Sequence, residues 1–201
     1  MPRKVNEENE RIKRAYLTFL REAKRCDQAT VLKAADAILR FEASTGYKSF
    51  KKFHIEQPRA FKAKLNEERS TTTGKPLSKA TVSGILRANK AFFIWLAGQP
   101  GYKSRISYPD AEYFNQNAKD ARIAHAAREA PYPTLAQCRH AFDRMPDGTD
   151  IERRNKALFA FLMITGARDG AISSFRLKHI DLVEGTVFQD AREVRTKAAK
   201  T

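Results

Sequence analysis

Residues 163–182 read MITGARDGAISSFRLKHIDL, and this stretch organises the rest of the chain. The pattern predicts an apolar helix that ends at Gly166, a short second helix that opens with Arg168, and a polar turn into strand-like sequence. The first turn of a helix carries partial positive charge, so a cation there costs roughly 0.3–1 kcal/mol unless an anion lies in front of it. Arg168 therefore predicts a phosphate or carboxylate partner. Asp169 or another nearby acid is the local alternative.

The stretch resembles the segment that carries the first catalytic arginine in tyrosine recombinases of the phage integrase type. The matching residues are Thr165-Gly166-Ala167-Arg168, Ile172, Phe175-Arg176-Leu177 and Ile180-Asp181-Leu182. The resemblance implies that Arg168 stabilises charge on the scissile phosphate. Two positions depart from the family pattern, because Ala171 stands where a carboxylate is usual and His179 stands where an aspartate is common.

A β-hairpin is expected after the arginine segment, with strands at 185–188 and 193–197 around a turn at 190–192. In the family this hairpin carries a catalytic lysine, so the resemblance implies that Lys197 is the general acid, with Lys200 as the alternative. The family's His-x-x-Arg box, a further His or Trp and the nucleophilic Tyr all follow the hairpin, and the 201 residues contain none of them there. We therefore expect the amino-terminal part of a recombinase, which binds DNA but does not cleave it.

Two features upstream of Arg168 are similar to the family's remaining catalytic residues, but we do not assign them that role. His125-Ala126-Ala127-Arg128 spells His-x-x-Arg but precedes Arg168, against the family order, and we expect it on a helix surface. Every tyrosine also precedes Arg168, so we expect core or interface aromatic residues rather than a nucleophile. They are Tyr16, Tyr47, Tyr102, Tyr108, Tyr113 and Tyr132.

The net charge of +15 and the pI near 10 indicate a polyanionic partner. Residues 1–130 hold 26 lysines and arginines against 14 acids, a net of +12, whereas residues 131–201 hold 12 against 9, a net of +3. No apolar run approaches the ~20 residues of a spanning helix, and no signal peptide is visible. Double-stranded DNA is therefore favoured over a membrane surface, and a cytoplasmic location is expected.

Neither a metal nor another cofactor is expected. Cys26 and Cys138 have no metal-ligand spacing and do not form a disulfide framework. The four histidines do not suggest a metal site either; they are His54, His125, His140 and His179.

Residues 44–109 are the densest positive stretch, with 13 lysines and arginines and three acids. A solvated surface normally mixes both signs, so the bias predicts contacts with DNA phosphates. The expected contacts are Lys48, Lys51, Lys52, Lys75, Lys79, Arg87, Lys90, Lys103 and Arg105. The aromatic residues Phe92, Phe93 and Trp95 fall at helical spacing in an apolar segment and are interpreted as core rather than as base-stacking residues.

The first region is predicted to be all-α. The first expected helix starts at a cap at Asn6, and the second starts at a cap at Asp27 or Thr30. A third covers about 56–69, a fourth runs from a cap at Ser78 to Gly98, and a further helical stretch crosses 109–127. This order of four to five helices resembles the SAM-like core-binding domain that precedes the catalytic domain in tyrosine recombinases.

Pro131 and Pro133 exclude regular helix, and they mark a boundary between domains. We expect a helical DNA-binding domain at 1–127, a linker at 128–134 and a partial α+β catalytic domain at 135–201. In the last region Thr134 is predicted to cap a helix, and a turn at 147–150 leads to an apolar helix at 158–164 whose surface stays partly uncovered.

The expected function is DNA binding by a site-specific tyrosine recombinase. By the resemblance, the full-length parent would break and rejoin DNA strands through a 3′-phosphotyrosine link and would self-associate on DNA. One alternative is a helical DNA-binding protein without chemistry, either a regulator or a decayed recombinase. Another is a basic RNA-binding protein whose Arg168 segment matches by chance.

Overall fold

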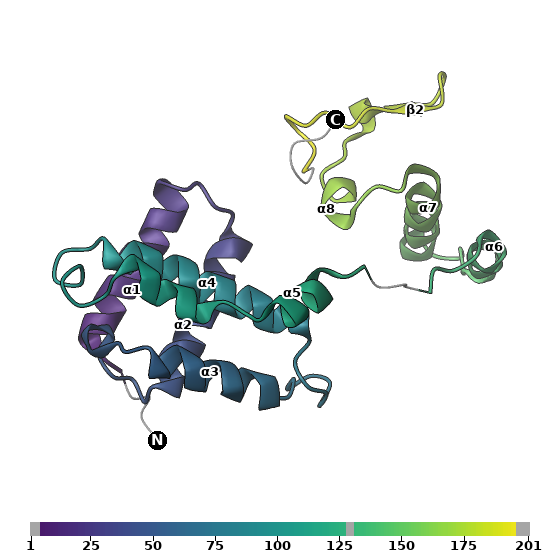
Figure 1. Cartoon of the computed structure of the whole chain (residues 1–201). Helices are drawn as coiled ribbons and strands as arrows, with labels where there is room; N and C mark the ends of the chain where they lie inside the picture. The colour runs from purple at the N-terminus through teal and green to yellow at the C-terminus, as the bar shows by residue number, and fades with distance from the viewer. Residues whose placement is uncertain (1–4, 128–130, 196–201) are drawn as a thin grey trace. The chain divides into compact units, whose positions relative to one another are not determined.

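The computed structural model describes residues 5–127 and 131–195 (Figure 1). It is mainly helical with one small two-stranded antiparallel sheet, which confirms the helical class predicted from the sequence. The chain divides into two compact units, Met1–Arg128 and Glu129–Thr201. Within the described ranges, no helix is long and apolar enough to cross a membrane.

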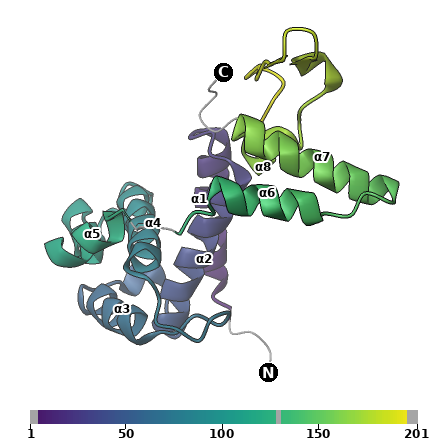
Figure 2. The same cartoon turned by 90° about the vertical axis from the view of Figure 1, so that its right-hand side faces the viewer.

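Helix α4 is the central element of the first unit, because it packs against α2, α5 and η2 (Figure 2). The elements of this unit are, in chain order, α1 (Glu7–Glu22), α2 (Gln28–Ser44), the 3-10 helix η1 (Phe50–Lys52), α3 (Glu56–Glu67), α4 (Lys79–Ala97), the 3-10 helix η2 (Tyr108–Phe114) and α5 (Ala118–His125).

Side-chain caps fix the starts of α1, α2 and α4. Asn6 accepts a hydrogen bond from the backbone N–H of Asn9, and Ser78 accepts one from that of Thr81, as their sequence positions predict. Asp27 caps α2, so the alternative start at Thr30 is wrong.

The helical stretch expected across 109–127 is interrupted. It forms η2 and α5, separated by residues 115–117, because Asn117 leaves helical geometry and accepts a hydrogen bond from the Asp120 N–H at 2.8 Å. Asparagine competes with helix propagation in this way, and its side chain starts a new helix instead.

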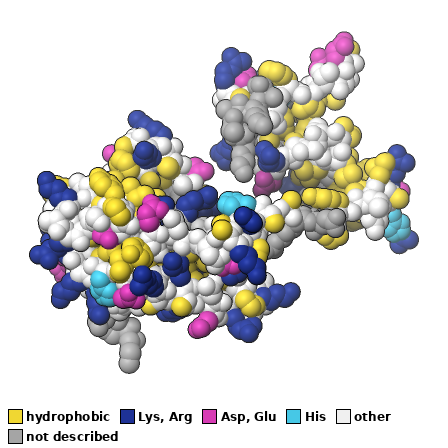
Figure 3. All heavy atoms as spheres, in the orientation of Figure 1, with side chains coloured by type: hydrophobic (Ala, Val, Ile, Leu, Met, Phe, Trp, Pro, Cys, Tyr) yellow, Lys and Arg dark blue, Asp and Glu magenta, His cyan; other side chains and the backbone are white. Residues whose placement is uncertain are grey.

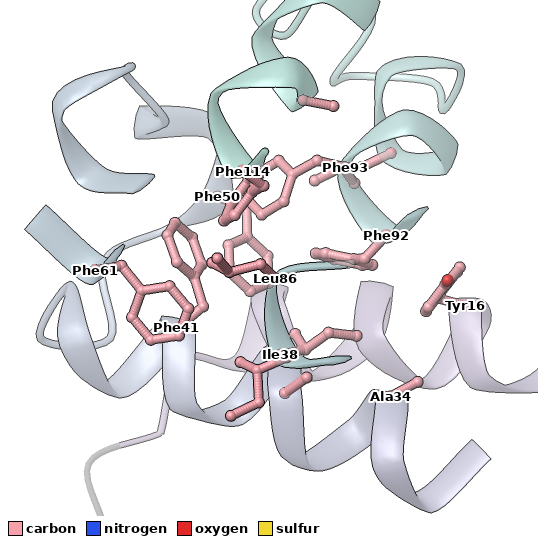
Figure 4. Packing of buried hydrophobic residues seen from close by; sticks show 14 of the residues in the cluster. Tyr16, Ala34, Ile38, Phe41, Phe50, Phe61, Leu86, Phe92, Phe93 and Phe114 are labelled. Atoms are coloured by element: carbon pink, nitrogen blue, oxygen red, sulfur yellow. The ribbon is translucent and has the colours of Figure 1, made fainter. Parts of the chain in front are cut away.

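The core of the first unit is a cluster of aromatic side chains around α4 (Figure 4). Phe92 and Phe93 are fully buried, so they are core residues, as predicted. The Phe93 ring lies 5.2 Å from that of Phe41 and 5.1 Å from that of Phe114, centroid to centroid. Trp95 is partly buried and packs on Tyr16 at 5.1 Å.

The second unit holds the segment around Arg168. Its elements are α6 (Leu135–Arg144), α7 (Asp150–Thr165), α8 (Asp169–Ile172), the 3-10 helix η3 (Leu177–His179), β1 (Ile180–Asp181) and β2 (Thr186–Val187). Thr134 caps α6 with Gln137 completing a capping box, as predicted for the cap. Helix α7 begins eight residues before the apolar run at 158–164, because Thr149 and Glu152 form a second capping box.

The hairpin lies earlier in the chain than predicted. Ile180 pairs with Val187 and Asp181 with Thr186, so the strand expected at 185–188 is present as β2 but pairs with the segment before it. The strand expected at 193–197 is wrong within the described residues. Asp181 Oδ1 accepts from the N–H groups of Val183 and Glu184, and Gly185 has a φ of +63°, so residues 182–185 form the turn. Residues 196 and 197 lie outside the described residues.

Residues 190–194 fold into a second turn instead of a strand. The Asp190 carbonyl accepts from the N–H groups of Glu193 and Val194, at 3.0 and 2.7 Å. Val194 is 2% exposed, so the chain packs inward at the point where a strand was expected to continue.

Helices α6 and α7 leave apolar side chains in contact with solvent. Leu135 is 61% exposed and Ile164 is 84% exposed, and Leu158, Leu162 and Met163 are between 40% and 43% exposed. Residues 131–133 have irregular backbone and Tyr132 is 82% exposed, while residues 128–130 of the expected linker lie outside the described residues.

Candidate nucleic-acid interface

Three of the nine predicted DNA contacts form ion pairs inside the first unit. The nitrogen–oxygen distances are 2.5 Å for Lys51 and Glu8, 2.9 Å for Lys79 and Asp120, and 2.8 Å for Lys90 and Glu112. The hydrogen bond from each lysine is the main reason that the pKa of its carboxyl partner is lowered. These pairs join α1 to η1 and join α4 to η2 and α5, so the three lysines contribute to the fold of the unit.

The other six predicted contacts are exposed, and their side chains form no ion pair or hydrogen bond with another described residue. They are Lys48, Lys52, Lys75, Arg87, Lys103 and Arg105. Figure 3 shows Lys and Arg side chains spread over the visible face of the first unit, with Asp and Glu side chains among them. A cation without a carboxylate partner keeps its charge available to a phosphate, so these six are the stronger candidates.

Arg168 is exposed at the start of α8. Helix α7 ends at Gly166, whose N–H donates to the Leu162 carbonyl at 2.9 Å, and Arg168 then occupies the N-cap position, one residue before the first turn. Asp169 does not neutralise it, because the Asp169 carboxylate accepts from the Gly170 N–H at 2.7 Å and forms no ion pair with Arg168. Among the described residues, the Arg168 guanidinium has no carboxylate partner.

The chain that leads to Lys197 lies against α8 and the turn that follows it. The Arg195 N–H donates to Ser174 Oγ at 2.8 Å. The Arg195 carbonyl oxygen lies 3.8 Å from the point where a side chain at Gly170 would begin. Lys197 and the alternative Lys200 lie outside the described residues. The main chain two residues before Lys197 therefore packs on the helix that Arg168 caps.

His179 and Glu193 connect the hairpin to the turn at 190–194. His179 is buried, its Nδ1 accepts from the Arg176 N–H at 3.1 Å, and its Nε2 lies 3.2 Å from Glu193 Oε2. Because Nδ1 is an acceptor, Nε2 carries the hydrogen and donates to the carboxylate. Lys178 also binds Glu193 at 2.7 Å, and this hydrogen bond is the main reason that the Glu193 pKa is lowered.

Glu193 was not among the site residues expected from the sequence. His179 was considered only as a departure from the family pattern and as one of the four histidines that suggest no metal site. Lys178 and His179 precede the observed hairpin and Glu193 follows it, and a buried histidine requires a hydrogen-bond partner.

Two of the upstream tyrosines belong to the core of the first unit. Tyr16 and Tyr102 are buried in the first unit, and burial raises the pKa of Tyr16 to about 12 and also raises that of Tyr102. A buried phenol of this kind is a poor nucleophile. His125 is exposed at the end of α5, while Arg128 lies outside the described residues.

Among the described residues, no three His, Cys, Asp or Glu side chains are grouped so that they could hold a metal ion. Cys26 and Cys138 are both free thiols. Comparisons with models of protein families, with curated proteins and with solved structures found no match to this chain.

Proposed function

We propose that the chain binds double-stranded DNA through its first unit and that it is related to the tyrosine recombinases. The observation that carries the DNA-binding proposal is the set of six exposed cations without carboxylate partners among the described residues, in a region with a net charge of +12. Each phosphate that such a cation neutralises releases condensed counterions, which supplies sequence-independent affinity. In this proposal the first unit corresponds to a SAM-like core-binding domain.

The second unit supports the proposed relationship through Arg168. Its exposed guanidinium can donate two parallel N–H groups to the non-bridging oxygens of a phosphodiester, where charge develops as the phosphorus becomes five-coordinate. The hydrogen bond from the Arg195 N–H to Ser174, which follows α8, supports the proposed role of Lys197 beside Arg168.

The proposed chemistry of the full-length parent is a transesterification. The hydroxyl of a tyrosine loses its proton to water as its oxygen bonds to the phosphorus. The bond between the phosphorus and the 5′-oxygen breaks, and the tyrosine remains linked to the 3′-phosphate. Lys197 supplies the proton that the departing 5′-oxygen needs. The part of the proposal that rests on the described residues is DNA binding.

A salt titration of DNA binding tests the proposal. The full chain is mixed with a labelled duplex, and the dissociation constant is measured by fluorescence anisotropy over a range of NaCl concentrations. The log–log slope should be steep, at about −0.9 for each phosphate neutralised on B-DNA. A flat response would contradict the proposal, and stronger binding to an RNA of the same length would favour the RNA-binding alternative.

A further inference from the structure

The loop after α2 has a strained conformation. Gly46 has a φ of +68° and Tyr47 has a φ of +61°. Glycine adopts this left-handed region freely, whereas a tyrosine adopts it only where the surrounding structure imposes it. The residue that follows this pair is Lys48, one of the six cations without a described partner.

Hydrogen bonds from α1 hold this loop in place. Asn6 Nδ2 donates to the Tyr47 carbonyl at 3.2 Å, and Asn9 Nδ2 donates to the Lys48 carbonyl at 2.9 Å. Asn9 Oδ1 also accepts from the Phe50 N–H at 2.9 Å. The backbone on both sides of the Lys48 side chain is therefore fixed, although the side chain itself is exposed.

The anchor behind the loop is a buried polar network. Asn9 and Glu42 are both fully buried, and Asn9 Nδ2 donates to Glu42 Oε1 at 2.8 Å. The Lys13 ammonium completes the network by binding the other Glu42 oxygen. A buried amide and carboxylate with all these partners specify one arrangement of the loop, because each unmade bond would leave a buried polar atom unsatisfied.

Lys48 lines a hollow between the end of α2 and α3, with a volume of about 350 Å³. Lys64 and His54 also line it, and neither side chain has a hydrogen-bond partner among the described residues. The hydroxyls of Ser44 and Thr45 donate to helix carbonyls, so the cationic groups are the available donors.

One acid lines the hollow. Glu56 Oε1 accepts from Arg59 at 2.6 Å, so its charge is already compensated. The remaining unpartnered donors, two ammonium groups and an imidazole, favour an anion.

We propose that this hollow receives one backbone phosphate of the bound DNA, held jointly by Lys48 and Lys64 with His54 beside them. The inference rests on the proposed DNA binding and adds the position at which one phosphate of the DNA backbone is bound. A nucleic acid is favoured as the source of this phosphate, because further exposed cations without described partners, including the nearby Lys52, lie outside the hollow. A polymer of phosphates needs such additional cations along its length.

The test is a double-variant cycle on the full chain. Dissociation constants for a labelled duplex are measured over a salt series for Lys48→Gln, Lys64→Gln and the two combined. If both lysines hold the same phosphate, the combined loss is smaller than the product of the two single losses, and the log–log slope changes by about 0.9 in total. The control pair is Arg87→Gln and Lys103→Gln on separate elements, whose losses should multiply.

Two outcomes would overturn this inference while leaving the proposed function intact. One is independent losses for Lys48 and Lys64, with a slope change of about 1.8. The other is wild-type affinity in both single variants while Arg87→Gln weakens binding. Absence of salt-dependent binding in the unmodified chain would instead reject the proposed function itself.

A second measurement separates DNA from a free anion. Inorganic phosphate is titrated into the full chain at constant ionic strength and followed by NMR at the amides of Thr45, Lys48 and Gln57. Duplex DNA should shift these amides, whereas phosphate at matched ionic strength should leave them unchanged. Saturable shifts with phosphate and none with the duplex would overturn the assignment to the DNA backbone.

Discussion

The backbone N–H of Arg195 donates to Ser174 Oγ at 2.8 Å, across 21 residues of chain. Ser174 follows α8, and its hydroxyl donates in turn to a carbonyl of that helix, with Ala171 O at 2.9 Å. The hydroxyl therefore bridges the Arg168 helix and the segment that precedes Lys197. Its removal should loosen this segment without affecting the basic surface of the first unit.

Ser174→Ala should increase hydrogen exchange at the Arg195 amide. The lost hydrogen bond corresponds to about 1 kcal/mol, or roughly five-fold faster exchange through local opening. Ser173→Ala is the matched control, because Ser173 Oγ donates only to Gly170 within the same short helix. Equal exchange in the two variants would show that Ser174 does not hold the segment.

Arg87 and Lys90 lie three residues apart on α4 and should respond differently to replacement by glutamine. Arg87 has no described partner, so Arg87→Gln should weaken duplex binding and reduce the log–log salt slope by about 0.9. Lys90 is engaged by Glu112 and by Asn115 Oδ1 at 3.0 Å, so Lys90→Gln should alter the salt slope less. Anisotropy titrations on the two variants measure both effects, and the reverse order would contradict the assignment.

Replacing Glu42 by alanine should strongly destabilise the first unit. The change leaves the Lys13 ammonium buried without its main counter-charge, which costs about 3–5 kcal/mol, and it removes one of the two acceptors of the Asn9 side-chain amide. Glu10→Gln is the control, because Glu10 pairs with Lys13 at a more exposed position and should cost less than about 1 kcal/mol. Urea unfolding followed by the fluorescence of Trp95, the single tryptophan, measures the difference.

The Asp190 carboxyl should titrate at unusually low pH. Hydrogen bonds from the Arg192 side chain and backbone lower its pKa from 3.8 to about 2. Because the pKa is lower in the folded state, the stabilisation is fully present above about pH 4 and is lost as the pH falls toward 2. Carboxyl NMR should report this value, and Arg192→Gln should raise it toward the ordinary range. An unchanged value in the variant would exclude Arg192 as the cause.

None of the six tyrosines should form a covalent link to DNA. In the proposed chemistry Arg168 and Lys197 stabilise charge and donate a proton, and all six tyrosines precede Arg168, against the order in the proposed family. The assay is incubation with a nicked suicide substrate followed by denaturing electrophoresis. An adduct that disappears in Arg168→Ala would show that an upstream tyrosine attacks, and that the interpretation of the six tyrosines is wrong.

Local signals predicted the helices well. The caps at Asn6, Ser78 and Thr134 depend on a side chain and a backbone group three residues away, so sequence spacing is enough to find them. The aromatic core around Phe92 and Phe93 follows from helical periodicity in the same way.

Contacts between distant residues were not predictable from spacing. Lys79 meets Asp120 across 41 residues, and a search for positive stretches could not detect this pairing. The hairpin register was missed because its strands have two residues each, and the turn at Gly185 rather than strand propensity decides the pairing. Whether Lys197 joins Arg168 stays a prediction, since it lies outside the described residues.

The exposed apolar side chains of α6 and α7 have a consequence for the solubility of the chain. At low ionic strength the net charge of +15 keeps copies apart by mutual repulsion. At 1 M salt the screening length falls to about 3 Å, and sulfate also strengthens the attraction between apolar surfaces. Leu135 and Ile164 then form apolar contacts between molecules. Ammonium sulfate should therefore precipitate this protein readily and reversibly, and dilute chloride should keep it dispersed.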